Sequence, residues 1–88
     1  MNTPYHISSD NVFRFIEHLM FESKKRNEME LFKKLDDALN LGSSALEILG
    51  AIRAILVENR STISKLFDSK NIEEADSVIA FVDTVYGR

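Results

Sequence analysis

Residues 43–60 read SSALEILGAIRAILVENR, and this stretch decides the fold that the sequence predicts. Its apolar residues recur three and four positions apart, which is the spacing of one face of an α-helix. A second apolar stripe lies beside the first and leaves only a narrow charged strip with Glu47 and Glu58. A helix this apolar is usually covered on more than one side. We therefore expect a central helix over residues 44–60, with the inner face Ala45, Ile48, Leu49, Ile52, Ile55 and Leu56.

Three further segments with helical spacing surround this central helix. Residues 9–25 and 28–40 precede it, and residues 72–86 follow it. No strand-like alternation of apolar and polar residues is visible, so the pattern predicts an all-α protein. We expect the core to contain Val12, Phe13, Ile16, Leu19, Phe32, Leu35, Leu39, Ile48, Leu49, Ile52, Ile55, Leu56, Val78, Ile79, Val82 and Val85.

Short polar signals predict where the first three helices begin and end. The second apolar stripe is rotated by roughly 110° from the first, which indicates a break between residues 24 and 27. Asn27 and Glu30 resemble a capping box that starts the second helix. Gly42 is expected to end that helix in the left-handed conformation. Ser44 and Glu47 form a second capping box at the start of the central helix.

The segment after Arg60 leaves two interpretations open. Residues 61–67 keep helical spacing but contain two serines and a threonine, which weaken helix propensity. The central helix extends to about Phe67, or a short separate helix forms near 62–68. Residues 68–71 read as the next turn, and Asn71 with Glu74 as the cap of the last helix. The predicted fold is a compact four-helix bundle, with a fifth short helix near 62–68 as the open question.

Composition places the chain among ordinary globular domains. Its 88 residues are 44% hydrophobic and 28% charged, which gives a single domain over residues 9–88 preceded by a flexible tail over 1–8. Cysteine is absent, so no disulfide or thiol site is expected. No apolar run is long enough to cross a membrane, and no secretion signal is visible, so we expect the cytoplasm. The net charge of −3 argues against a nucleic-acid-binding protein.

Groups that could carry chemistry are few and scattered. His18 and Glu22 lie four residues apart on a helix, but a metal site needs three or four ligands. Asp36 and Asp37 are adjacent, and adjacent helical side chains diverge by 100°, so they do not converge on one substrate. We expect no catalytic residue, no metal and no cofactor.

A helix-turn-helix DNA-binding regulator is the alternative function. Ala38 lies four residues before Gly42, which is a spacing found in such turns. However, the surface over residues 43–50 offers almost no side chain that could reach a base edge or a phosphate. The basic residues at 24–26, 33 and 34 could form a basic patch, but acidic residues at 28, 30, 36 and 37 are interleaved with them. An ordinary helical hairpin explains the same residues.

Apolar residues outside the predicted inner faces favour a non-enzymatic protein–protein interaction module. The arrangement is similar in outline to small accessory or regulatory helical proteins of bacteria and phages, with no motif that identifies a family. Such a surplus in a small chain is typical of a homodimer or of a domain that docks one protein partner. The predicted partner-binding residues are Phe21, Leu46, Gly50, Val57 and Phe81.

Overall fold

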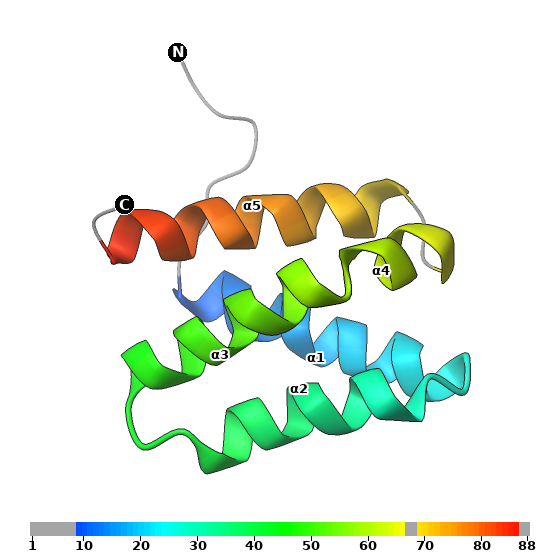
Figure 1. The fold of residues 1–88 in the computed structure, drawn as a ribbon, viewed down its shortest axis with the longest axis horizontal. Coiled ribbons are helices and arrows are strands. Elements are labelled where there is room, and N and C mark those ends of the chain that lie inside the picture. Colours follow the sequence, from blue (N-terminus) through cyan, green and yellow to red (C-terminus); the bar gives the residue numbers. More distant parts are fainter. Residues whose placement is uncertain (1–8, 67–68, 87–88) are drawn as a thin grey trace.

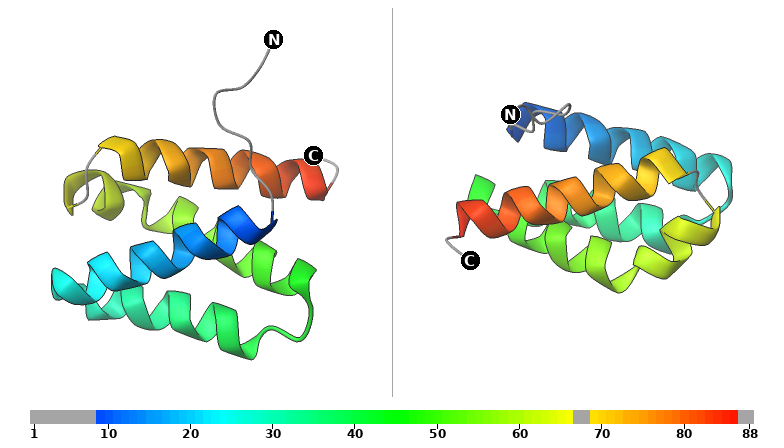
Figure 2. Two further views of the ribbon diagram at one scale, coloured as in Figure 1. Left: turned by 180° about the vertical axis from the view of Figure 1, so that it is seen from behind. Right: turned by 90° about the horizontal axis from the view of Figure 1, so that it is seen from above.

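The computed structural model describes residues 9–66 and 69–86, and the described part is all-α. Five helices follow one another: α1 (Ser9–Lys25), α2 (Met29–Leu41), α3 (Ala45–Glu58), α4 (Arg60–Leu66) and α5 (Ser69–Val85). In Figure 1, α3 crosses in front of α1, with α2 below and α5 above. The view from above in Figure 2 places α1 and α4 on opposite faces of the molecule. The predicted bundle is confirmed, and the short fifth helix is present as α4.

The predicted central helix is covered on two flanks, as its apolar sequence requires. α3 contacts α2, α4 and α5, and α2 and α5 both run antiparallel to it (Figure 1). Its inner face is Leu49, Ile52 and Leu56, which are all buried. Burying three large aliphatic side chains contributes roughly 5–9 kcal/mol before the entropy of ordering the chain is subtracted. The other large buried side chains come from α1, α2, α4 and α5.

The break between α1 and α2 lies where the sequence predicts it, but Asn27 acts differently. Asn27 adopts a left-handed conformation with φ 64° and so ends α1 instead of capping α2. The Glu28 amide donates to the Ser23 carbonyl at 2.7 Å, and the Asn27 amide donates to the Lys24 carbonyl at 3.1 Å. These two bonds form a Schellman motif, in which asparagine tolerates the left-handed position. The predicted capping box with Glu30 is therefore wrong.

The link between α2 and α3 confirms one cap and corrects the role of the glycine. The Ser44 hydroxyl accepts a hydrogen bond from the Glu47 amide at 3.2 Å and caps α3. Gly42 is extended, with φ −71° and ψ 137°, so the predicted left-handed conformation is wrong. A Cβ at Gly42 would lie 2.4 Å from Cγ1 of Ile48. The glycine therefore permits the close approach of the α2 end to the first turn of α3.

The end of α3 and the start of α5 both differ from the predicted positions. α3 ends at Glu58, and Asn59 separates it from α4. α5 begins at Ser69, so Asn71 lies inside the helix and the predicted cap at Asn71 and Glu74 is wrong. The predicted turn over 68–71 is wrong for residues 69–71, which are helical, and Asp68 lies outside the described residues. Phe67 and the predicted tail over 1–8 also lie outside them.

Most of the predicted core is confirmed, with additions at the flanks. α1 packs against both α2 and α5, so it buries a wider arc than its main stripe and takes in Phe15. Val85, predicted as core, is 41% exposed because it is the last residue of α5 and has few neighbours. The predicted core residues that are half-buried and pack against the core's edge are Phe13, Leu39, Ile48, Ile55 and Ile79. Phe32, also predicted as core, is half-buried. Buried residues that the sequence did not single out as core are Phe15, Ser23, Leu31, Ala38, Ile63 and Ala75.

Candidate functional site: a groove between α2 and α3

The predicted partner-binding residues lie on different parts of the surface. Phe21 is 65% exposed on the outward face of α1. Phe81 is only half-buried at the edge of the core, so it is largely part of the packing of α5. Leu46 and Gly50 lie beside Tyr86 at the end of α5, and Val57 shares their face of α3 by its spacing. The structure therefore does not bring these five residues into one site.

The flank of α3 with Leu46 and Gly50 is occupied by the end of α5. The Tyr86 hydroxyl donates a hydrogen bond to the Leu46 carbonyl. A Cβ added at Gly50 would meet the Tyr86 hydroxyl at 2.9 Å, so the glycine makes room for this ring. Leu46 and Val57 remain about half exposed, at 51% and 48%. Gly50 therefore serves the packing of α5 on α3.

Two ion pairs join α3 and α4 to α5. Nε of Arg53 lies 2.6 Å from Oδ1 of Asp83, and both side chains are about one third exposed. Arg60 binds both carboxylate oxygens of Asp76 at 2.9 Å. The hydrogen bonds from Arg60 lower the pKa of Asp76 and raise the pKa of the Arg60 guanidinium. Because these charged groups already pair with one another, fewer of them on the side of α3 that faces α5 are available to bind a partner.

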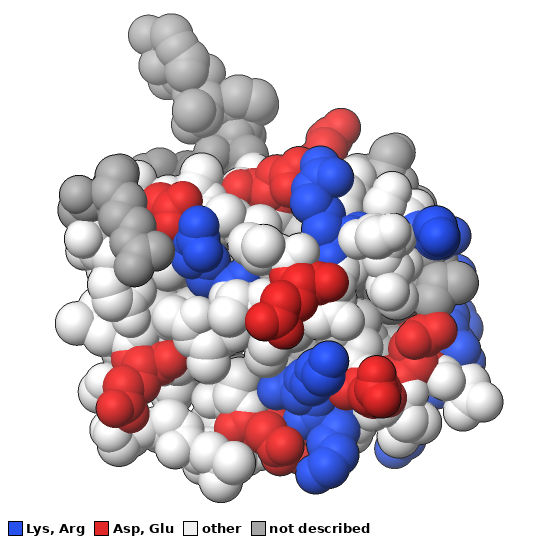
Figure 3. Space-filling view, in the orientation of Figure 1, with Lys and Arg blue, Asp and Glu red and all other residues white. Residues whose placement is uncertain are grey.

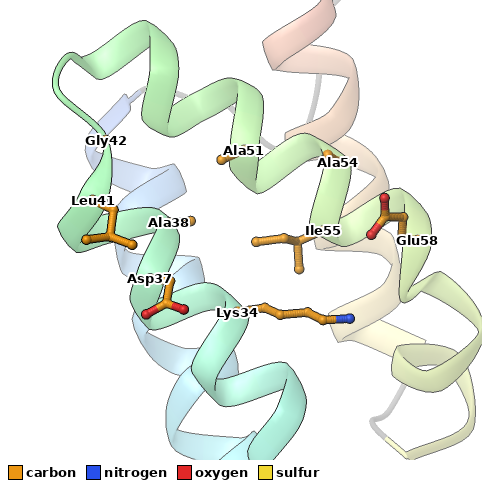
Figure 4. Close-up of a pocket in the computed structure, with 9 residues that line it drawn as sticks. All are labelled: Lys34, Asp37, Ala38, Leu41, Gly42, Ala51, Ala54, Ile55 and Glu58. Carbon is orange, nitrogen blue, oxygen red and sulfur yellow. The ribbon is translucent and has the colours of Figure 1, made fainter.

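On its other flank, α3 forms an open apolar groove with α2. The groove has a volume of about 520 Å³. Its aliphatic lining, which defines what we call the α2–α3 groove, is Ala38 and Leu41 from α2 and Ala51, Ala54 and Ile55 from α3. Leu41 is 78% exposed, the largest exposed fraction of any large apolar side chain in the described part of the chain. Figure 4 shows Ile55 reaching from α3 toward α2 across the groove.

Small side chains on α3 explain why the groove is open. Ala51 and Ala54 are both exposed and face the space beside α2. Larger residues at these two positions would fill the space between the helices. Ile55 is half-buried and packs on the core below, so it forms part of the floor. The groove therefore results from alanines at the outward edge of an otherwise well-packed helix.

Charged side chains stand only at the edges of the groove. Lys34 extends from α2 toward α3 and Glu58, as Figure 4 shows. Asp37 lines the α2 side, and its carboxylate lies 3.6 Å from Nζ of Lys33. The polar lining groups thus flank an aliphatic floor instead of converging on one point.

The outward face of α3 has an acidic residue at each end. Glu47, Ala51, Ala54 and Glu58 lie at positions i, i+4, i+7 and i+11, which share one helix face. The Glu47 carboxylate accepts hydrogen bonds from the amide, at 2.8 Å, and from the hydroxyl of Ser43. These bonds lower the pKa of Glu47, so it is ionised at neutral pH. Figure 3 shows uncharged surface over the middle of α3 with acidic side chains on either side.

The groove was missed by sequence reasoning for an identifiable reason. The strip with Glu47 and Glu58 is visible in the sequence, and Ala51 and Ala54 lie between them at helical spacing. Alanine is also the best helix former, so its presence there does not by itself indicate a surface. Only the position of α2 beside this strip turns the alanines into one wall of a groove.

The other candidate groups stay apart in the structure. His18 is exposed on α1, and the described residues hold no group of three metal-binding side chains. Asp36 accepts a hydrogen bond from Asn40 at 2.9 Å, while Asp37 lies beside Lys33. No helix in the described part of the chain is long and apolar enough to span a membrane.

The turn between α2 and α3 leads into an acidic helix face. Between Ser43 and Glu58, the only basic residue is Arg53, and it is paired with Asp83. A DNA-reading helix normally presents basic or amide side chains to the groove of the duplex.

Comparisons with protein-family models, with curated proteins and with solved structures found no match.

Proposed function

We propose that this chain is a non-enzymatic helical interaction module that docks one protein partner in the α2–α3 groove. The observation that carries the proposal is an exposed aliphatic groove with charges only at its edges. Docking of an amphipathic helix requires such a groove, because its apolar face is buried while its polar edges stay in water. A small-molecule site needs a few polar groups that converge on the ligand. The α2–α3 groove has none on its floor.

The exposure of Leu41 supports the same proposal. A large aliphatic side chain that is 78% exposed contributes little to the fold. Covering it would add up to about 2 kcal/mol of favourable burial to a complex. The DNA-binding alternative has no comparable support, because the exposed face of α3 is acidic.

The test uses two matched alanine-to-arginine variants. Ala54→Arg places a long charged side chain in the α2–α3 groove, and Ala80→Arg places the same side chain on the exposed outer face of α5. Immobilised wild type and both variants are exposed to a lysate of the source organism, and retained proteins are quantified. Each retained protein is then purified and its complex with the chain is weighed by light scattering.

A defined complex that forms with the wild type and Ala80→Arg, and is lost with Ala54→Arg, supports the proposal. A partner that binds all three equally would place docking outside the α2–α3 groove. Circular dichroism of the three proteins provides the control for folding, and their spectra should be the same because both alanines are exposed.

A further inference from the structure

Resting on the proposed docking function, we infer that the α2–α3 groove receives an amphipathic helix with a basic residue at each end of its apolar stripe, and not a second copy of this chain. The partner chemistry follows from the order of residues along the outward face of α3. That order is acidic, small, small, acidic, at Glu47, Ala51, Ala54 and Glu58. The last three line the α2–α3 groove, and Glu47 lies one helical turn before Ala51 on the same helix face. The two carboxylates are separated by eleven residues of helix, or roughly 16 Å.

A partner helix that lies along α3 repeats the same spacing. Positions i, i+4, i+7 and i+11 of any α-helix share one face and cover the same length. Lysine or arginine at i and i+11 therefore meets Glu47 and Glu58 together. Small or apolar residues at i+4 and i+7 meet Ala51 and Ala54. The partner is recognised by apolar contact in the middle and by charge at both ends.

Glu47 is held in place before a partner arrives. Its carboxylate accepts hydrogen bonds from the Ser43 amide and hydroxyl, which also lower its pKa. A carboxylate that is ordered and ionised loses little side-chain entropy when it pairs with a cation. A basic side chain therefore pairs with Glu47 at a lower entropic cost than with a glutamate that no hydrogen bond holds in place.

Symmetry argues against a second copy in this position. A two-fold contact of α3 with itself runs either antiparallel or parallel. An antiparallel contact centred between Ala51 and Ala54 places Glu47 opposite Glu58 of the other copy, twice. A parallel contact places each glutamate opposite itself. Both alignments oppose carboxylate to carboxylate, which weakens association.

Lys34 does not relieve the repulsion between the carboxylates of two copies of α3. It belongs to α2, on the other wall of the groove, and lies at the Glu58 end only. The opposite wall also carries Asp37, which already lies beside Lys33. The stripe on α3 itself has no basic residue between Glu47 and Glu58 except Arg53, which is directed to Asp83 on the other flank.

The test uses two designed helical peptides as probes. Both carry alanine and leucine at i+4 and i+7; one has lysine at i and i+11, and its twin has glutamate there. Fluorescence anisotropy measures the affinity of each peptide for the full chain at low and high salt. We expect the lysine peptide to bind roughly two- to thirtyfold more tightly at low salt, from two exposed charge pairs, with the difference shrinking at high salt.

Variants of the chain assign the effect to residues. Glu47→Gln with Glu58→Gln should remove the preference for lysine, and glutamine keeps the capping bond to Ser43. The matched control changes two exposed glutamates outside the groove, Glu17→Gln and Glu73→Gln, and should keep the preference. Ala54→Arg should weaken both peptides, because it blocks the groove itself.

Three results would overturn the inference, and they separate it from the proposed function. Equal affinity of both peptides, with Ala54→Arg weakening both, leaves docking in the α2–α3 groove but rejects a basic partner. Tight binding that Ala54→Arg does not affect rejects both the groove and the partner. A stable dimer of the wild type, abolished by Ala54→Arg, would show a second copy in the groove and reject the inference.

Discussion

The buried hydroxyl of Ser23 gives the sharpest prediction about stability. Ser23 lies near the end of α1 with no exposed surface, and its hydroxyl has no hydrogen-bond partner among the described residues. A buried polar group without a partner costs about 1–3 kcal/mol of stability. Ser23→Ala removes that cost and leaves the Ser23 carbonyl free to keep its bond from the Glu28 amide. The substitution should therefore stabilise the chain.

The expected change in the free energy of unfolding for Ser23→Ala is the sum of two stabilising contributions and one small destabilising contribution. Relief of the unpaired hydroxyl contributes about 1 kcal/mol at the lower end of its range. Alanine adds up to about 0.5 kcal/mol through its higher helix propensity. The lost oxygen leaves a space smaller than a methyl group, which costs well under 1 kcal/mol. We expect a net gain of about 0.5–1.5 kcal/mol, or a rise in Tm of roughly 2–12 °C for a domain of this size.

Urea and thermal unfolding followed by circular dichroism measure this gain. Ser64→Ala is the matched control, because Ser64 is exposed on α4 and reports helix propensity alone. Its gain should stay below about 0.5 kcal/mol. If Ser23→Ala is no more stable than the wild type, the hydroxyl has a partner in solution and the reasoning fails.

Three further substitutions test the packing and the electrostatics. Ile52→Asp should abolish cooperative folding, because it buries an unpaired charge at a position with no exposed surface, and a native circular dichroism spectrum would contradict this. Gly50→Ala should leave the free energy of unfolding in urea nearly unchanged, because a helix-propensity gain of about 1 kcal/mol is offset by displacement of the Tyr86 hydroxyl. When Tyr86→Phe has already removed that hydroxyl, Gly50→Ala should raise the free energy of unfolding by the full helix-propensity gain. Asp76→Asn should lower stability at pH 6 but not at pH 2: Arg60 lowers the folded-state pKa of Asp76, so its contribution is present above the unfolded-state pKa and lost as the pH falls through the folded-state value. An equal loss at both pH values would contradict this linkage.

The helices themselves could be predicted from the sequence because each carries a continuous apolar stripe. The ends of the helices are harder to predict than the helices themselves, because the same residue types occur at both the N-terminal and the C-terminal ends of helices. Asparagine favours both an N-cap and the left-handed position after a helix, and Asn27 takes the second role. Gly42 likewise fits a left-handed turn, yet it is needed because Ile48 packs against it. At Gly42 the close approach of Ile48, six positions along the chain, requires the glycine, and helix spacing alone does not show this contact.

The candidate site could not be predicted in the same way. A helical wheel identifies Phe21 and Leu46 as lying off the inner face, but it does not show which neighbour covers a residue. Tyr86 covers Gly50 from the far end of the chain, forty positions away from the Leu46 carbonyl that it binds. The α2–α3 groove depends on the distance and angle between two helices, which the spacing of residues does not specify.

Backbone amide chemical shifts test the central claim most directly. The labelled chain is titrated with the peptide that carries lysine at both ends, and every amide is followed through the titration. Docking in the α2–α3 groove predicts the largest changes at Leu41, Ala51, Ala54 and Glu58, with little change at Phe21 on the outward face of α1. Changes centred on Phe21, or unchanged amides along both walls of the groove at saturation, would contradict the account.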